Sequence, residues 1–240
     1  MSPSNPTISK TPPVPDREGD IFLVSYPKSG RTWVRQFLAQ YMSLVFDLGY
    51  TEKYDLMALM RIVPAEWFLS EHPNCFKYAD DLRVPRIRCT HYEYGARFKG
   101  KPIIWLTRGI EDTLVSYYYH WKREESVNEF VCNTVDEYIR WHNLWHLALQ
   151  EMPHLHIAYE WLTRDSTYWW MRVVNFCGLP LDYAKMAIAL ERSSFEYMKA
   201  CQEGTTEVRV RKGKVGGYED ELSAETIAFL AEKKKELLWS

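Results

Sequence analysis

The chain has 240 residues, a formal net charge of −2 and a composition that is 46% hydrophobic and 26% charged. That length suffices for one domain with a substantial core, and the nearly balanced charge excludes the broad positive surface that duplex DNA binding requires. Aromatic residues are frequent, at 15% of the chain. Most must pack in the core, and the others are candidates for the walls of a pocket that binds flat apolar ligands.

The N-terminal composition and the cysteines bear on the compartment. No apolar stretch approaches the length of a membrane span, and residues 1–19 are rich in Pro and Ser without the apolar centre of a secretory signal. The cysteines are odd in number and show no CxxC spacing, which argues against a disulfide framework and fits a reducing compartment. We therefore expect a disordered leader over residues 1–19, one domain over residues 20–240, and a soluble, cytoplasmic protein.

The first structured segment opens a βαβ unit. Residues 21–26, IFLVSY, form an apolar run with β-branched and aromatic members, which predicts a buried strand. A turn that contains Gly30 follows, and apolar residues then recur at helical spacing from Thr32 to Asp47. Strand, glycine turn and helix are the beginning of a βαβ motif.

The alternation of strands and helices continues to the C-terminus. The pattern predicts further strands at 86–91, 102–107 and 154–160, and helices at 111–121, 134–150, 165–177, 182–192 and 223–238. Thr134 and Glu137 match a capping box at the start of one of these helices, and the polar, glycine-rich residues 203–220 are expected to form a loop over the site. The fold class predicted is α/β, a single domain with a mostly parallel central sheet flanked by helices, whose ligands bind outside the carboxyl ends of the strands.

The turn after the first strand has the composition of an anion-binding loop. Residues 26–33 read YPKSGRTW, and the first amides of the following helix, with its dipole, favour a phosphate there. Gly30 permits close approach, Lys28 adds a positive charge, and Ser29 and Thr32 add hydroxyl donors. The segment predicts a P-loop-like phosphate-binding strand–turn–helix, with a simple turn before a helix as the alternative.

Two later segments also carry groups suited to phosphate. Arg108 follows the predicted strand 102–107 and can grip a phosphate bidentately, and Ser116 lies on the helix just beyond it. Residues 210–218, VRKGKVGGY, form a basic glycine-containing loop. Taken singly, each segment has a structural alternative: a strand-end arginine, a serine bonded to its own helix, or a solvated basic loop.

One histidine lies at a strand end, where a histidine more often has a structural than a catalytic role. His91 ends the predicted strand 86–91, and a pKa near 6.5 suits a group that accepts a proton near neutral pH. Arg88 and Cys89 are adjacent on this strand. Side chains alternate between the two faces of a strand, so Arg88 is expected to point away from the side that Cys89 faces. The other histidine group, at positions 142, 146, 154 and 156, lacks a His-Glu-x-x-His motif or a cysteine pair, so we expect no metal site.

Taken in this order over residues 21–218, the segments resemble the PAPS-dependent sulfotransferases of the cytosolic type. The first motif is similar to the family's 5′-phosphosulfate loop PKSGTTW, the second to its 3′-phosphate segment, and the third to its late RKGxxG segment. This sequence departs from the family in two places near the expected chemistry. Arg31 stands where the family has the first threonine of its loop, and Cys89 stands where it has a lysine before the histidine.

The resemblance implies a sulfotransferase that moves a sulfuryl group from 3′-phosphoadenosine-5′-phosphosulfate (PAPS) to a hydroxyl or amine of a small acceptor. It implies His91 as catalytic base and Lys28 as the stabiliser of the leaving group, with no metal. Arg31 is a candidate to supply the charge missing at Cys89. Trp33 is expected to stack on adenine. The residues implied in binding the donor are Lys28, Ser29, Gly30, Arg31, Thr32, Trp33, Arg108, Ser116, Tyr159, Ser194, Phe195, Arg211, Lys212 and Gly213.

The acceptor is not specified by these motifs. Aromatic residues are candidates for an apolar pocket, which favours a phenol, an alcohol or a lipid, while sugars also stack on aromatic rings. The aromatic candidates are Trp67, Phe68, Tyr92, Tyr94, Tyr117 and Tyr119.

Two other functions remain open at this point. One is a P-loop small-molecule kinase, although the lysine here precedes the glycine and no strand ends in an aspartate for magnesium. The other is a nucleotide-binding protein without catalysis, which the departures at Arg31 and Cys89 allow.

Overall fold

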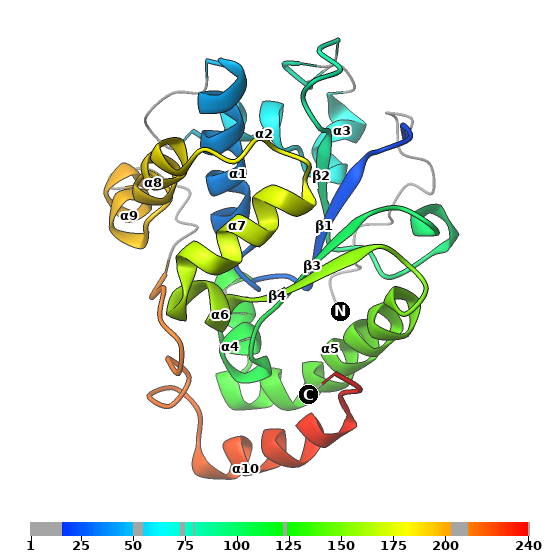
Figure 1. Ribbon diagram of the computed structural model, residues 1–240. Coiled ribbons are helices and arrows are strands. Elements are labelled where there is room, and N and C mark those ends of the chain that lie inside the picture. The colour runs from blue at the N-terminus through cyan, green and yellow to red at the C-terminus, as the bar shows by residue number, and fades with distance from the viewer. Residues whose placement is uncertain are drawn as a thin grey trace.

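The computed structural model describes residues 16–49, 55–72, 75–78, 80–121, 124–202 and 211–239. The centre of the fold is a four-stranded sheet in the order β2-β1-β3-β4, in which all neighbours are parallel (Figure 1). Strands β1 and β3 are buried along their whole length, which explains their unbroken apolar sequences. The predicted α/β class and parallel sheet are confirmed. The strands are β1 Ile21–Ser25, β2 Ile87–Thr90, β3 Ile103–Thr107 and β4 His154–Ala158.

Helices cover both faces of the sheet. The expected helices correspond to α1, α4, α5, α7, α8 and α10, whereas the sequence patterns missed α2, α3, α6 and α9. The missed helices are six to eight residues long, too short to show a clear helical period. The helices are α1 Arg31–Phe46, α2 Leu56–Ile62, α3 Glu66–Glu71, α4 Ile110–Trp121, α5 Val127–Leu149, α6 Tyr159–Arg164, α7 Ser166–Phe176, α8 Tyr183–Glu191, α9 Phe195–Gln202 and α10 Ala224–Lys233.

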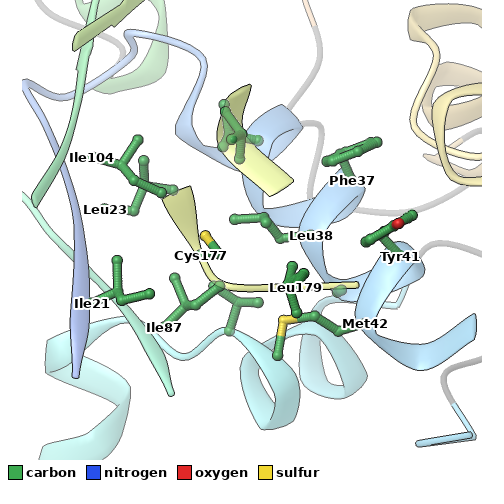
Figure 2. Close-up of a cluster of buried hydrophobic side chains, with 14 of the residues drawn as sticks. Ile21, Leu23, Phe37, Leu38, Tyr41, Met42, Ile87, Ile104, Cys177 and Leu179 are labelled. Atoms are coloured by element: carbon green, nitrogen blue, oxygen red, sulfur yellow. The ribbon is translucent and has the colours of Figure 1, made fainter. Parts of the chain in front are cut away.

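The strands alternate their side chains between two cores. Ile21 and Leu23 of β1 face helices α1, α2, α7 and α8, whereas Phe22 and Val24 face α4, α5 and α10. Figure 2 shows the first core, where side chains of three strands and of α1 converge on Cys177 and Leu179 after α7. The sheet is packed between the two cores, so the loops at the carboxyl ends of its strands start from fixed positions.

The start of α5 corrects one prediction. The helix begins at Val127, with Ser126 as its cap, and not at Thr134. Ser126 accepts from the Glu129 amide, and the Glu129 carboxylate accepts from the Ser126 amide, so the capping box is formed by this pair. The same residue spacing occurs twice in this stretch. The helix starts at the earlier pair, Ser126 and Glu129, because the buried Phe130 and Val131 extend its apolar face towards the N-terminus.

A buried histidine in α5 makes stability depend on pH. His142 is fully buried, its Nδ1–H donates to the Tyr138 carbonyl at 2.9 Å, and its Nε2 has no partner among the described residues. Burial lowers the pKa of His142 to about 3. In the unfolded chain the same side chain protonates near pH 6.5. The unfolded state therefore binds more protons below that pH, and stability falls as the pH falls from about 6.5 towards about 3.

We expect this histidine alone to remove about 2 kcal/mol of unfolding free energy between about pH 7.5 and about pH 5. Urea unfolding of wild type and His142→Phe at both pH values measures the effect. The variant is expected to lose about 2 kcal/mol less than wild type over this range. An identical pH dependence in the two proteins would contradict the assignment.

Several expectations from the sequence stay predictions. Most of the expected leader, residues 1–15, and part of the expected loop, residues 203–210, lie outside the described residues. In the described part of the chain, no helix has both the length and the apolar composition needed to cross a bilayer. The proposed domain boundaries and the cytoplasmic location are not tested by the fold.

Candidate functional site

The carboxyl ends of all four strands meet at one large cavity. The loop 26–31 follows β1, His91 follows β2, Arg108 follows β3 and Tyr159 follows β4, and all of them line it. The cavity has a volume of about 1700 Å³, larger than a typical site for one small ligand. The chain passes from β1 to β2 on one side and then crosses to β3 on the other side of β1, so the strand order reverses at β1. Ligands bind at such a reversal point.

The loop after β1 is shaped around its backbone. Gly30 caps α1 with φ of 95°, and an added Cβ would lie 2.5 Å from the Tyr159 ring, so a side chain here meets both strain and a clash. The amides of Trp33 and Val34 both donate to the Gly30 carbonyl, at 3.0 and 3.3 Å, so α1 begins directly at this loop. The Ser29 side chain is fully buried, and its Oγ has no partner among the described residues. A buried orphan hydroxyl beside the N-terminus of a helix fits a bound anion.

An aromatic wall stands beside the loop. The rings of Trp33 and Tyr159 meet edge to face with centroids 5.3 Å apart, and Trp33 packs in the same way on Trp170 at 5.4 Å. The Arg108 guanidinium lies 4.4 Å from the Tyr159 ring centroid. Burial raises the pKa of Tyr159, so its hydroxyl stays protonated and able to donate. The wall offers ring faces and a hydroxyl, the features that a purine base requires.

The Arg108 side chain is fixed by hydrogen bonds to two separate loops. It donates to the Lys28 carbonyl at 3.4 Å and to the Lys214 carbonyl at 3.2 Å, and it lies 3.8 Å from the Asp112 carboxylate. Its Nε is buried without a partner among the described residues. The side chain therefore joins the loop after β1 to the basic loop at residues 211–218, called the late loop below. One of its donors remains for a ligand.

Asp112 fixes the late loop and was not recognised as a site residue from the sequence. Its carboxylate accepts from the Gly216 amide at 2.8 Å and from the Tyr218 amide at 3.2 Å. The side chain is buried, so these bonds are protected from water. Asp112 lies in the first turn of α4, and its contact with residues about a hundred positions away leaves no local sequence signal.

The basic residues of the late loop share one acidic partner. Arg211 and Lys212 both contact the Glu221 carboxylate, at 2.7 and 2.5 Å. An added Cβ on Gly213 would lie 2.0 Å from the Phe195 ring, so only glycine lets the loop lie against Phe195. The loop thus presents two cations that share one carboxylate, so one positive charge of this group is not balanced within it. Glu221 is a second residue that the sequence patterns did not indicate.

His91 has a defined tautomer. Its Nδ1–H donates to the Ser25 carbonyl at 2.6 Å, because a carbonyl can only accept, and this leaves the Nε2 lone pair for a substrate. The Trp141 indole donates to the His91 carbonyl at 3.0 Å and fixes the backbone. Burial, followed by the charge of Arg31, lowers the pKa of His91 well below its usual value. The imidazole is therefore neutral at pH 7 and is available as a base.

The departures at Arg31 and Cys89 lie in the same cavity as His91. Burial raises the pKa of the Cys89 thiol, so the side chain is neutral. Positive charge comes instead from Arg31, which lines the cavity, and from Arg35 one turn further along α1, where it donates to the Val63 carbonyl at 2.8 Å. Arg88 lies on the opposite face of β2, as expected, and pairs with Glu66 at 2.6 Å.

The structure brings the predicted site residues together. Among those expected to bind the donor, every one lines the cavity except Ser29, whose buried side chain lies beneath the loop. Of the aromatic candidates for the acceptor pocket, Trp67, Tyr92 and Tyr117 line the cavity. Phe68, Tyr94 and Tyr119 do not line it. Among the described residues, no cluster of three or more acidic, cysteine or histidine side chains is arranged to hold a metal.

The fold and cavity define an α/β protein that binds a phosphorylated ligand at the carboxyl edge of a parallel sheet. The chain matches the sulfotransferase domain family over residues 18–238. It therefore belongs to the sulfotransferase family, the enzymes that transfer a sulfuryl group from PAPS, and the resemblance found in the sequence motifs is confirmed. This membership sets the kinase alternative aside.

Curated relatives are similar in sequence, and solved structures share the fold. Human sulfotransferase 2A1 is 26% identical over 200 residues, which cover 76% of this chain and 67% of that protein, so the chain spans about two thirds of such a relative. Mouse sulfotransferase SULT7A1 complexed with PAP superposes with a TM-score of 0.67 at 20% identity, covering 95% of this chain and 86% of the other. Retinol dehydratase in complex with retinol and PAP gives a TM-score of 0.69 at 18% identity, covering 95% and 83%.

Proposed function

We propose that this chain binds PAPS in the cavity and transfers its sulfuryl group to a hydroxyl or amine of a small acceptor, with His91 as general base. One observation carries the proposal. The phosphate-type loop after β1, which has a buried hydroxyl without a partner beneath it, lines the same cavity as a neutral histidine with an open Nε2. The volume of about 1700 Å³ leaves room for an acceptor beside a nucleotide.

The residues present fit a donor with two phosphate groups. The β1 loop offers amides, the Ser29 hydroxyl and the Lys28 charge for the 5′ end. The buried Nε of Arg108 and the two cations that now pair with Glu221 suit the 3′-phosphate. The wall of Trp33 and Tyr159 suits adenine. Solved relatives of this fold carry PAP.

PAPS supplies the activated sulfuryl group, and the chain supplies position, charge and a base. His91 takes the acceptor's proton on Nε2, and its hydrogen bond to Ser25 holds the ring in place. Lys28 and Arg31 stabilise the negative charge that grows where the sulfuryl group departs. Arg108 and the late loop discriminate against a nucleotide that lacks the 3′-phosphate, because with such a nucleotide their N–H groups would remain without a hydrogen-bond acceptor.

Calorimetric titration with PAP, AMP and ATP tests the donor site directly. We expect PAP to bind at least about 100-fold more tightly than AMP, because charge-assisted hydrogen bonds to the 3′-phosphate contribute about 1.5–3 kcal/mol each. Equal affinities for PAP, AMP and ATP would overturn the donor assignment. Tight PAP binding without turnover of PAPS on any acceptor would instead favour the remaining alternative, a nucleotide-binding protein without catalysis.

A further inference from the structure

The two cations of the late loop line the cavity, but their charged groups are bonded to a residue outside its wall. Arg211 and Lys212 are both among the residues that line the cavity, whereas Glu221 is not. One oxygen of Glu221, Oε1, lies 2.7 Å from Nη1 of Arg211 and 2.5 Å from Nζ of Lys212. The N–H groups that contact Glu221 therefore bond to a partner that is not part of the cavity.

Tyr119 completes this contact from the end of α4. The Arg211 guanidinium lies 4.7 Å from the centroid of the Tyr119 ring, and the Tyr119 hydroxyl forms a hydrogen bond with the Glu221 carboxylate. Tyr119 also lies outside the cavity wall. Three donors thus converge on one carboxylate, in the way that donors converge on the oxygens of a bound phosphate.

The backbone fixes the position of Glu221. Its amide donates to the Tyr218 carbonyl at 2.9 Å, and the Tyr218 amide is in turn bonded to Asp112 at 3.2 Å. The Glu221 side chain is 9% exposed. Burial alone would raise the pKa of Glu221, but the hydrogen bonds from its three donors outweigh burial, and the pKa is lowered. The carboxylate is therefore ionised at neutral pH and is held at a defined place beside the loop.

We propose that Glu221 is an internal competitor of the 3′-phosphate. It holds Arg211 and Lys212 in the unloaded site, and it gives up these contacts when a nucleotide with a 3′-phosphate binds. The inference rests on the proposed function and concerns the regulation of the same site. Because part of the binding free energy is used to break the contacts with Glu221, the apparent affinity is lower than it would be with unpaired cations.

The competition acts on donor and product alike. Transfer of the sulfuryl group leaves the 3′-phosphate unchanged, so PAPS and PAP offer the same group to the late loop. Glu221 recovers the two cations when PAP dissociates, and this makes the dissociation more favourable. The contact therefore lowers the affinity for PAP and shortens the lifetime of the PAP complex. AMP has no 3′-phosphate and is not affected.

Titration of wild type and Glu221→Gln with PAP and AMP tests the proposal. Glutamine keeps the shape of the side chain and removes its charge. We expect Glu221→Gln to bind PAP about tenfold more tightly than wild type, because two partly exposed ion pairs no longer have to be broken. The affinity for AMP is expected to change by less than about twofold. Stopped-flow displacement of PAP should show a correspondingly slower dissociation.

Two further variants complete the design. Glu221→Asp keeps the charge on a side chain that is one methylene shorter, and its affinity for PAP is expected to fall between those of wild type and Glu221→Gln. The matched control is Glu219→Gln, which removes an exposed carboxylate of the same segment that is not a partner of Arg211 or Lys212 in the described structure. It is expected to keep the wild-type ratio of PAP to AMP affinity.

The outcomes separate competition from its alternatives. A weaker or unchanged affinity of Glu221→Gln for PAP would overturn the proposal and leave Glu221 with the positioning of the two cations. An equal gain for PAP and AMP, or the same gain in Glu219→Gln, would overturn it in favour of a general effect of net charge. Failure of wild type to prefer PAP over AMP would instead overturn the proposed function.

Discussion

Replacing His91 by glutamine is expected to lower kcat by about 10²–10⁴-fold, the usual contribution of a positioned general base. The affinity for PAP is expected to stay within about twofold of wild type, because the hydrogen bond of the imidazole goes to the Ser25 carbonyl and its Nε2 is assigned to the acceptor and not to the nucleotide. Steady-state turnover with PAPS and a phenol measures the first effect, and calorimetry with PAP measures the second. His154→Gln, at an exposed position in β4, is the matched control and is expected to retain wild-type turnover.

The pH profile gives an independent test of the same role. A base is active when deprotonated, so activity falls as the pH drops through its pKa. Burial and the charge of Arg31 hold the pKa of His91 well below 6.5, so the acid limb moves to lower pH. We expect kcat/KM to be flat between about pH 6.5 and about pH 8. Near-normal turnover in His91→Gln, or loss of wild-type activity already around neutral pH, would remove His91 from the base role.

The position of the site was predictable because it depends on local sequence and on one rule of topology. A short apolar run before a glycine turn predicted β1 and the loop of Lys28, and the parallel order then brought the ends of the other strands to the same edge. His91, Arg108 and Tyr159 each follow a strand, and for this reason they reach one cavity. No contact between them had to be known in advance.

Other parts of the site depend on contacts that the sequence does not encode locally. Asp112 holds the amides of Gly216 and Tyr218, and Glu221 neutralises the cations of the late loop. Glu137 was interpreted as part of a capping box, yet it lies inside α5 and faces the cavity. In each case a charged residue takes its role from a neighbour that only the tertiary fold supplies.

The second large effect is expected from Arg108. Its guanidinium holds the carbonyls of Lys28 and Lys214 and keeps a buried Nε for a ligand. If that ligand is the 3′-phosphate, Arg108→Ala should weaken PAP binding by about 100-fold, since a charge-assisted hydrogen bond contributes up to about 3 kcal/mol. AMP lacks this phosphate, so its affinity should change by less than about threefold. Titration of wild type and variant with both nucleotides measures the ratio.

The ratio of PAP to AMP affinity separates recognition from support of the fold. Arg108 also packs on the Tyr159 ring, so a purely structural role would disturb the adenine wall and weaken both nucleotides equally. Arg108→Lys retains the charge but not the planar fork, and we expect it to recover only part of the discrimination. Arg172→Ala, which removes an arginine from an exposed aromatic contact on α7, is the control and should bind both nucleotides as wild type does. Equal losses for PAP and AMP would assign Arg108 to the wall and leave the 3′-phosphate to Arg211 and Lys212.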